Sequence, residues 1–158
     1  GRSVLLKGDG KGGFTFINAR KSGLRIYGEQ RGSAVADYNH DGRPDLVVTQ
    51  NGAATHLYRN TLAQPGLRVR LKAGDANPTG VGARARLKFE TGKLGPARLI
   101  TGGSGYWSQD SAVQVLALPE HPTEIIVTWP NGKTTPTPVP AGAKEISIDM
   151  ETELRSPK

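Results

Sequence analysis

A strict alternation of apolar and basic residues marks two segments in the second half of the chain. In residues 67–72 the apolar side chains stand at 67, 69 and 71 and the basic ones at 68, 70 and 72, and residues 83–89 repeat the pattern. Successive side chains of a β-strand point to opposite faces of a sheet. Each segment therefore predicts a strand with one apolar face for the core and one cationic face. The cationic positions are Arg68, Arg70, Lys72, Arg84, Arg86 and Lys88.

Shorter β-prone runs occupy much of the remaining chain. Residues 3–7 and 14–17 flank a glycine-rich stretch, which predicts a hairpin. Trp129 is in phase with Ile125 and Val127, so we expect it in the core, and residues 130–132 after it are typical of a tight turn. Residues 1–62 show no sustained helical spacing. Further strands are predicted at residues 33–36, 46–49, 55–58, 112–118, 124–129 and 144–150.

The spacing of turn-forming residues between these runs predicts an all-β fold. The 21 glycines and 11 prolines stand between the apolar runs along the 158-residue chain. A turn or linker at residues 63–66 divides the chain into a first segment, residues 1–62, and a second segment, residues 66–150. For the second segment we expect a β-sandwich or a small barrel. Residues 151–158 are interpreted as a polar tail.

Composition narrows the possible functions. The chain contains no cysteine, which excludes disulfides and thiolate metal sites. No run of about eighteen apolar residues is present, so we expect no membrane span. The formal net charge of +7 favours anionic partners and equally fits plain solubility. No specific nucleic-acid motif accompanies the charge.

The sharpest local motif is a run of oxygen donors at every second residue, with a glycine at its sixth position, Gly42. Calcium takes six to eight oxygen ligands, which a tightly curled loop of this spacing supplies. The motif is not an EF-hand, because the twelfth position holds Val48 in place of a glutamate. A metal-free turn rich in Asp, Asn and Gly is the alternative. The predicted ligands are the side chains of Asp37, Asn39, Asp41 and Asp45 and the carbonyl of Arg43.

Residues 37–48, with residues 57–60 after them, resemble the VCBS/FG-GAP repeat. Residues 5–14 are similar to the outer hairpin of a preceding blade in that family. From residue 66 onward the chain is similar to the ASPIC/UnbV module. Four pieces carry the second resemblance, at residues 67–71, 80–84, 103–109 and 127–132.

The resemblance implies partial propeller-type hairpins in residues 1–62, a structural calcium ion in the loop, and an extracellular or periplasmic, secreted protein. A complete propeller needs about four or more blades, so we expect this chain to be the C-terminal part of a larger protein. Two departures from the family pattern are residues 116–118, which lack its aromatic and glycine-containing step, and the basic net charge.

Two surfaces are candidates for ligand binding. Tyr106 and Trp107, in a glycine-rich loop, supply flat apolar surface for a sugar ring or another flat ligand, and packing is the alternative. We predict that the two cationic strands share one sheet face, and six cations on one face require an anionic ligand or nearby acidic residues. An acidic polysaccharide or a protein would be such a ligand. A merely solvated face is the alternative.

No catalytic constellation is evident. Ser104 stands between glycines, but Tyr106 breaks the spacing of a nucleophile elbow. None of His40, His56 and His121 has a catalytic context. Residues 80–84 lack the third glycine and the Lys-Ser/Thr ending of phosphate loops.

We therefore expect a calcium-stabilised extracellular adhesion or ligand-binding module that is not an enzyme. Two alternatives stay open. One is an enzyme that modifies small molecules in a natural-product pathway, which the ASPIC/UnbV resemblance suggests. The other is a purely structural cap of a propeller.

Overall fold

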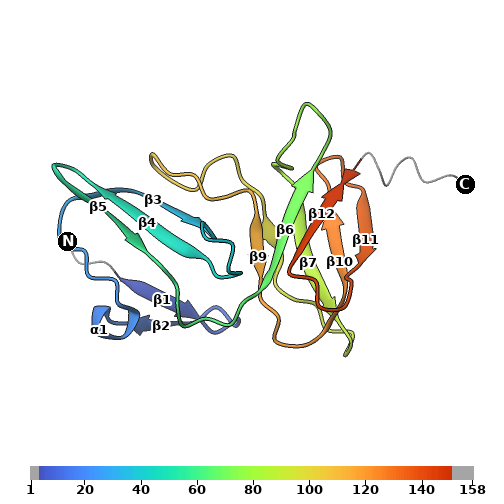
Figure 1. The fold of residues 1–158 in the computed structure, drawn as a ribbon, viewed down its shortest axis with the longest axis horizontal. Coiled ribbons are helices and arrows are strands. Elements are labelled where there is room, and N and C mark those ends of the chain that lie inside the picture. Colours follow the sequence, from blue (N-terminus) through green and yellow to red (C-terminus); the bar gives the residue numbers. More distant parts are fainter. Residues whose placement is uncertain (1–3, 151–158) are drawn as a thin grey trace, which may run out of the picture.

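The computed structural model describes residues 4–150, and its regular secondary structure is almost entirely β-strand, which confirms the all-β prediction. Figure 1 shows an N-terminal part, β1 to β5, beside a larger C-terminal part, β6 to β12. The elements are β1 Leu5–Gly8, β2 Phe14–Ile17, α1 Ala19–Ser22, β3 Gln30–Ala36, β4 Asp45–Gln50, β5 Ala53–Tyr58, β6 Leu67–Lys72, β7 Arg84–Phe89, β8 Arg98–Leu99, β9 Gln114–Leu116, β10 Pro122–Thr128, β11 Thr134–Pro138 and β12 Glu145–Asp149. The polar tail predicted at residues 151–158 lies outside the described residues.

The N-terminal part contains two small antiparallel sheets. β1 and β2 form the predicted hairpin, and β3, β4 and β5 follow one another in a three-stranded sheet. The hairpin turn is closed by the Asp9 carboxylate, which accepts hydrogen bonds from the backbone N–H groups of Lys11 and Gly13. That these sheets belong to a propeller stays a prediction.

The one-turn helix α1 was not predicted. The Asn18 side chain accepts a hydrogen bond from the Lys21 N–H at its start, and Gly23, with φ 76°, ends it. Four residues are too few to display a helical period. No helix in residues 4–150 is long and apolar enough to cross a membrane.

The C-terminal part is a sandwich of two sheets. One has the strand order β11-β10-β7-β8, and the other has the order β12-β6-β9, in which β12 runs parallel to β6. Their inward faces share one core, and the prediction of Trp129 as a core residue is confirmed. Each fully buried aliphatic side chain contributes about 1.5–3 kcal/mol. The fully buried side chains of this core include Leu67, Val69, Leu71, Leu87, Ile125 and Val127.

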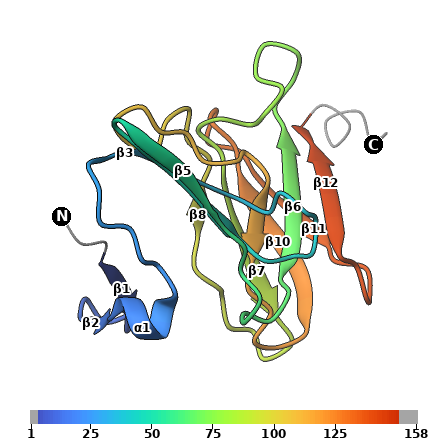
Figure 2. The ribbon, with the colours of Figure 1, turned by 60° about the vertical axis from the view of Figure 1, so that its left-hand side comes forward.

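The prediction that the two cationic strands share a sheet face is wrong. β6 lies between β12 and β9, whereas β7 lies between β10 and β8 in the opposite sheet. Figure 2 shows β12 alongside β6. Because the apolar residues of both strands point into the common core, their basic residues point to opposite outer surfaces of the sandwich.

Within residues 4–150, two regions join the N-terminal part to the sandwich. One is the loop between β3 and β4, described below. The other is the segment after β8, which pairs with the edge strand β3. There Ser33 donates its N–H to Ser108 Oγ at 2.9 Å, Val35 donates its N–H to Asp110 Oδ1 at 2.8 Å, and the Val35 carbonyl accepts from the Ser111 N–H at 2.9 Å. The outer edge of β3 is therefore partly covered.

Candidate functional site

The loop with alternating oxygen donors, residues 37–45, connects β3 to β4 and is tightly curled. We call it the donor loop. His40 and Gly42 have positive φ angles of 60° and 79°. A Cβ atom at position 42 would lie 3.1 Å from both the Gly66 carbonyl oxygen and the Pro65 side chain. Gly42 is thus required both for its conformation and for the close approach of the segment before β6.

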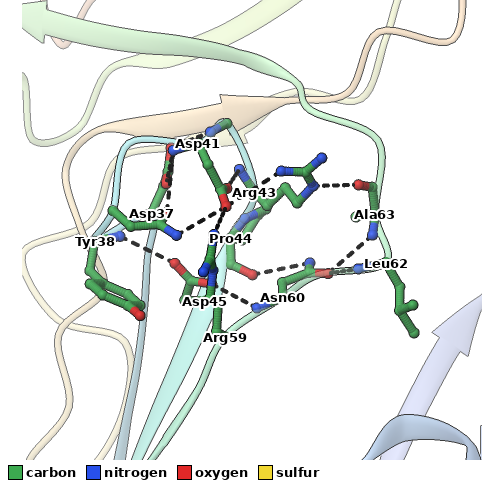
Figure 3. Close-up of polar contacts among 12 residues, drawn as sticks. Asp37, Tyr38, Asp41, Arg43, Pro44, Asp45, Arg59, Asn60, Leu62 and Ala63 are labelled. Atoms are coloured by element: carbon green, nitrogen blue, oxygen red, sulfur yellow. Dashed lines mark hydrogen bonds and ion pairs between the residues drawn. The ribbon is translucent and has the colours of Figure 1, made fainter.

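Three of the predicted ligands are joined by hydrogen bonds in this loop. Figure 3 shows two of them, Asp37 and Asp41. Asp37 Oδ1 and Asn39 Oδ1 accept from the same N–H, that of Asp41, at 3.0 and 3.2 Å. Asn39 Nδ2 in turn donates to Asp41 Oδ2 at 3.0 Å. Gly42 donates its N–H to Asp37 Oδ2 at 2.9 Å. The loop therefore brings the first three donor side chains into one hydrogen-bonded cluster.

Asp45 ties the start of β4 to both the loop and the end of β5. It is buried, its Oδ1 accepts from the Asn60 N–H at 2.7 Å, and its Oδ2 accepts from the Tyr38 N–H at 3.3 Å. Sequence reasoning assigned no role to Asn60. Its side chain donates to the Pro44 carbonyl and accepts from the Leu62 and Ala63 N–H groups, which Figure 3 displays. The only sequence signal was its place in the segment that resembled the repeat.

Arg68, on β6, connects the loop to the sandwich. Its side chain is 95% buried, its Nη1 donates to both the carboxylate and the carbonyl of Asp37, and its Nε donates to Glu145 Oε2 at 2.9 Å. The prediction of Arg68 as an exposed ligand contact is therefore wrong. The outward side of Arg68 is covered by Asp37 and Glu145, which are far from it in the sequence. The alternation within residues 67–72 does not reveal these neighbours.

Arg68, its partner Glu145 and the loop residue Asp41 have shifted pKa values. Burial lowers the pKa of Arg68, but hydrogen bonds to Glu145 and Asp37 outweigh it and the net pKa is raised. The hydrogen bond from Arg68 lowers the pKa of Glu145. Burial raises the pKa of Asp41, yet hydrogen bonds from Asn39 and Arg59 prevail and lower it. All three groups are therefore held in their charged forms.

The donor set fits calcium chemically, because it consists of carboxylate, amide and carbonyl oxygens. Within residues 4–150 no three His, Cys, Asp or Glu side chains form a ready-made metal cluster. The carboxylates are instead satisfied by backbone N–H groups and by arginines, with Arg43 and Arg59 each 3.4 Å from Asp41. Calcium binding at this loop stays a prediction.

The second candidate surface is the glycine-rich loop after β8. Tyr106 and Trp107 are 67% and 81% exposed and stack on each other, with ring centroids 5.3 Å apart. They border a hollow of about 560 Å³ with residues at the ends of β3 and β4. Exposure on this scale argues against the alternative that the two rings serve the core. The other lining residues are Arg31, Thr49, Gln50 and Asn51.

The remaining strand cations differ in their counter-charges. Arg70 lies 3.6 Å from Glu145, Lys72 lies 3.5 Å from Asp149, and Lys88 lies 2.9 Å from Glu124. For Arg84 and Arg86, the part of the chain that the structure describes provides no ion pair. The acidic residues expected beside a cationic face are thus present for four of the six cations.

The residues weighed as catalytic have other surroundings. Ser104 donates its N–H to the Ser108 carbonyl, and no hydrogen bond joins it to a histidine among residues 4–150. His121 pairs with Glu90 at 3.3 Å, and the His56 ring stacks on that of Tyr58.

Known family models match a segment in each of the two parts of the molecule. The family model for the FG-GAP repeat matches residues 31–58, which cover β3 except its first residue, the donor loop, β4 and β5. The model described as ASPIC and UnbV matches residues 73–154, just over half of the chain. The comparison of this chain with curated proteins found no match. Both resemblances seen in the sequence are confirmed, and the chain belongs to the ASPIC and UnbV family, with an FG-GAP repeat preceding that domain.

Proposed function

We propose that this chain is a calcium-stabilised, non-enzymatic module for adhesion or ligand binding outside the cell. One observation carries the proposal. The loop that offers calcium ligands is bonded both to its own sheet and, through Asp37 and Arg68, to the sandwich. An ion in this loop would therefore stabilise the junction between the two parts.

The loop would hold calcium through its four donor side chains and the Arg43 carbonyl. When bound, the ion supplies positive charge among three carboxylates that otherwise repel one another. Two further contacts fix the loop against the segment that leads into β6. Gly66 donates its N–H to the Gly42 carbonyl at 2.8 Å, and Arg43 Nε donates to the Ala63 carbonyl at 2.6 Å. Tightening the loop would thus also order this segment.

A location outside the cell fits both the family and the chemistry. FG-GAP repeats typically occur in extracellular or periplasmic proteins. Calcium sites of extracellular modules have dissociation constants of about 10⁻⁴–10⁻³ M. A loop with one amide among its donors and two arginines beside Asp41 suits that weak range, because the arginines reduce its net negative charge.

Ligand binding is supported by the Tyr106–Trp107 loop. Two stacked, exposed rings beside guanidinium, amide and hydroxyl groups offer a flat apolar surface with polar groups around it. The loop rests on β3 through Ser108, so the hollow spans both parts of the molecule. Among the described residues Ser104 has no histidine partner, which favours ligand binding over catalysis at this loop.

Thermal unfolding with calcium and with chelator tests the proposal. The wild type should melt at a higher temperature in calcium, and Asp41→Ala should lose most of that rise. In chelator the variant should lose much less than in calcium, because only the hydrogen bonds and ion pairs of its carboxylate are then removed. A ligand at about a hundred times its dissociation constant stabilises the native state by about 2.7 kcal/mol. Asp75→Ala is a matched control, because Asp75 is exposed and lies in a different loop. A wild type with the same midpoint in both conditions would refute calcium stabilisation.

A further inference from the structure

The outer face of β7 holds two arginines without counter-charges in the described part of the chain. Arg84 stands opposite Thr128 of β10 and Leu99 of β8, and Arg86 stands opposite Ile126 of β10. Their neighbour on the same face, Lys88, is instead opposite Glu124 and bonded to it. Neither adjacent strand presents a carboxylate to the two arginines.

Both arginines line the same hollow. Alternate residues of a strand lie about 7 Å apart on one face, so the two guanidinium groups belong to one small region. The hollow measures about 240 Å³, less than the roughly 300–1,000 Å³ of pockets for drug-sized ligands. It therefore has room for a single charged group and part of a ring. The lining residues are Arg84, Ala85, Arg86, Ala97, Ile126 and Thr128.

We propose that this hollow binds a sulfate or carboxylate group of an acidic polysaccharide. The guanidinium fork matches the oxygen geometry of such oxyanions and bonds them through two parallel N–H groups. The Thr128 hydroxyl, 3.4 Å from that of Thr134, adds a neutral polar group, and Ile126 and Ala97 add apolar surface for a ring. A bound anion relieves the repulsion between the two arginines.

The same features argue against other anionic partners. Proteins that bind nucleic acid tightly contact about 6–10 phosphates or stack bases on aromatic rings. This hollow has two cations and no aromatic residue in its lining. An acidic sugar chain, with single charged groups on a polar ring, fits it better.

The inference rests on the proposed ligand-binding function but not on its calcium part. All six lining residues come from β7, β10 and the segment before β8, and none comes from the donor loop. We therefore expect polysaccharide binding to be the same in calcium and in chelator.

Calorimetric titration with heparin-derived oligosaccharides at low salt tests the site. Arg84→Gln with Arg86→Gln should weaken binding about tenfold or more, since a hydrogen bond to a charged group contributes about 1.5–3 kcal/mol. The matched control is Arg70→Gln with Lys72→Gln, which removes the same charge from the opposite sheet. It should change the affinity less than about twofold. The thermal midpoint of each variant in chelator verifies its fold.

A second sugar identifies the charged group that is bound. Polygalacturonate oligosaccharides carry carboxylates only, so tight binding of both sugars assigns a general oxyanion site, and binding of heparin alone assigns a sulfate site. Either result supports the proposal.

Three results would overturn the proposal. The first is equal loss in both double variants, which would reduce the effect to net charge. The second is no binding of either sugar. The third is equally tight, equally arginine-dependent binding of a DNA oligonucleotide of the same length. If neither sugar binds but calcium still raises the melting temperature, the polysaccharide site is refuted while the proposed calcium stabilisation stands.

Discussion

Strands β6 and β7 carry the same alternation of apolar and basic residues, yet their basic residues meet different surroundings. On β6, Arg68 is covered by the donor loop and bonded to Asp37 and Glu145, and its two successors pair with acidic residues of β12. On β7, Lys88 is the one cation with an ion-pair partner within residues 4–150. The same local pattern thus connects the two parts of the molecule in one strand, and in the other it leaves two cations without an ion pair to any described residue.

The difference arises from what lies across each outer face. β12 runs parallel to β6 and places Glu145 and Asp149 beside its cations. The outward residues of β10 beside Arg84 and Arg86 are Thr128 and Ile126, which carry no charge. Alternation determines which residues face the core, but the neighbouring strand determines whether an outward cation is structural or available.

The largest expected effect is that of removing Arg68. Arg68→Met leaves the buried Asp37 carboxylate without its cation, and breaking a buried ion pair from one side costs about 3–5 kcal/mol. Urea unfolding at neutral pH in chelator measures the loss. Arg86→Met is the control from β7 and should stay within about 0.5 kcal/mol of wild type. A cost below about 1 kcal/mol for Arg68→Met would contradict the structural role of Arg68.

Acid should weaken the β6 network next. The hydrogen bond from Arg68 holds the pKa of Glu145 below the ordinary 4.5, so this carboxylate contributes stability that is present above that value. The contribution is lost as the pH falls through the lower pKa of the folded state. We expect Glu145→Gln to flatten the decline of stability between about pH 5 and pH 3 by no more than about 1 kcal/mol, because Glu145 is partly exposed.

A series of unfolding curves across that range, for wild type and Glu145→Gln, checks the effect. Glu120 offers a comparison on the surface. Its pKa is lowered by the Thr91 hydroxyl first and by Lys93 second, with no buried cation involved. Glu120→Gln should alter the acid slope less than Glu145→Gln. Parallel curves for wild type and Glu145→Gln would contradict the assigned role of Arg68 in holding this carboxylate.

Local patterns predicted much of the fold. The alternation at residues 67–72 coincides with β6, and the phase of Trp129 with Ile125 and Val127 correctly placed all three in the core. The tight turn at residues 130–132 was also correct, since Gly132 has φ 83° and donates its N–H to the Trp129 carbonyl. Each of these features depends on residues that are near one another in the chain.

The strand that follows that turn was missed for a physical reason. β11 contains Pro136 and Pro138, which lack N–H donors and argue against a strand. β11 is tolerated because it is the edge strand of its sheet, bonded to β10 alone. Its place at the edge follows from the order of strands, which the sequence of one segment does not reveal.

In the candidate site, too, the local features could be predicted from the sequence and the long-range contacts could not. The donor spacing in residues 37–45 and the need for Gly42 could be predicted, because a loop of nine residues sets its own geometry. The contact between Asp37 and Arg68 joins residues 31 positions apart, and that between Arg68 and Glu145 joins residues 77 apart. These depend on how β3, β6 and β12 come together, so Arg68 was taken for a surface cation.

The smallest expected effect is that of the surface pair between β7 and β10. Lys88 and Glu124 lie 2.9 Å apart, but their side chains remain 42% and 35% exposed, so water and salt screen the attraction. A double-mutant cycle with Lys88→Ala and Glu124→Ala should give a coupling energy of about 0.2–1 kcal/mol that declines as salt is added. The same cycle with Arg68→Met and Asp37→Asn should give a larger value that salt hardly changes, because that pair is buried. Similar couplings for both pairs, with the same salt dependence, would mean that burial does not distinguish β6 from β7, and the contrast between the two strands would fail.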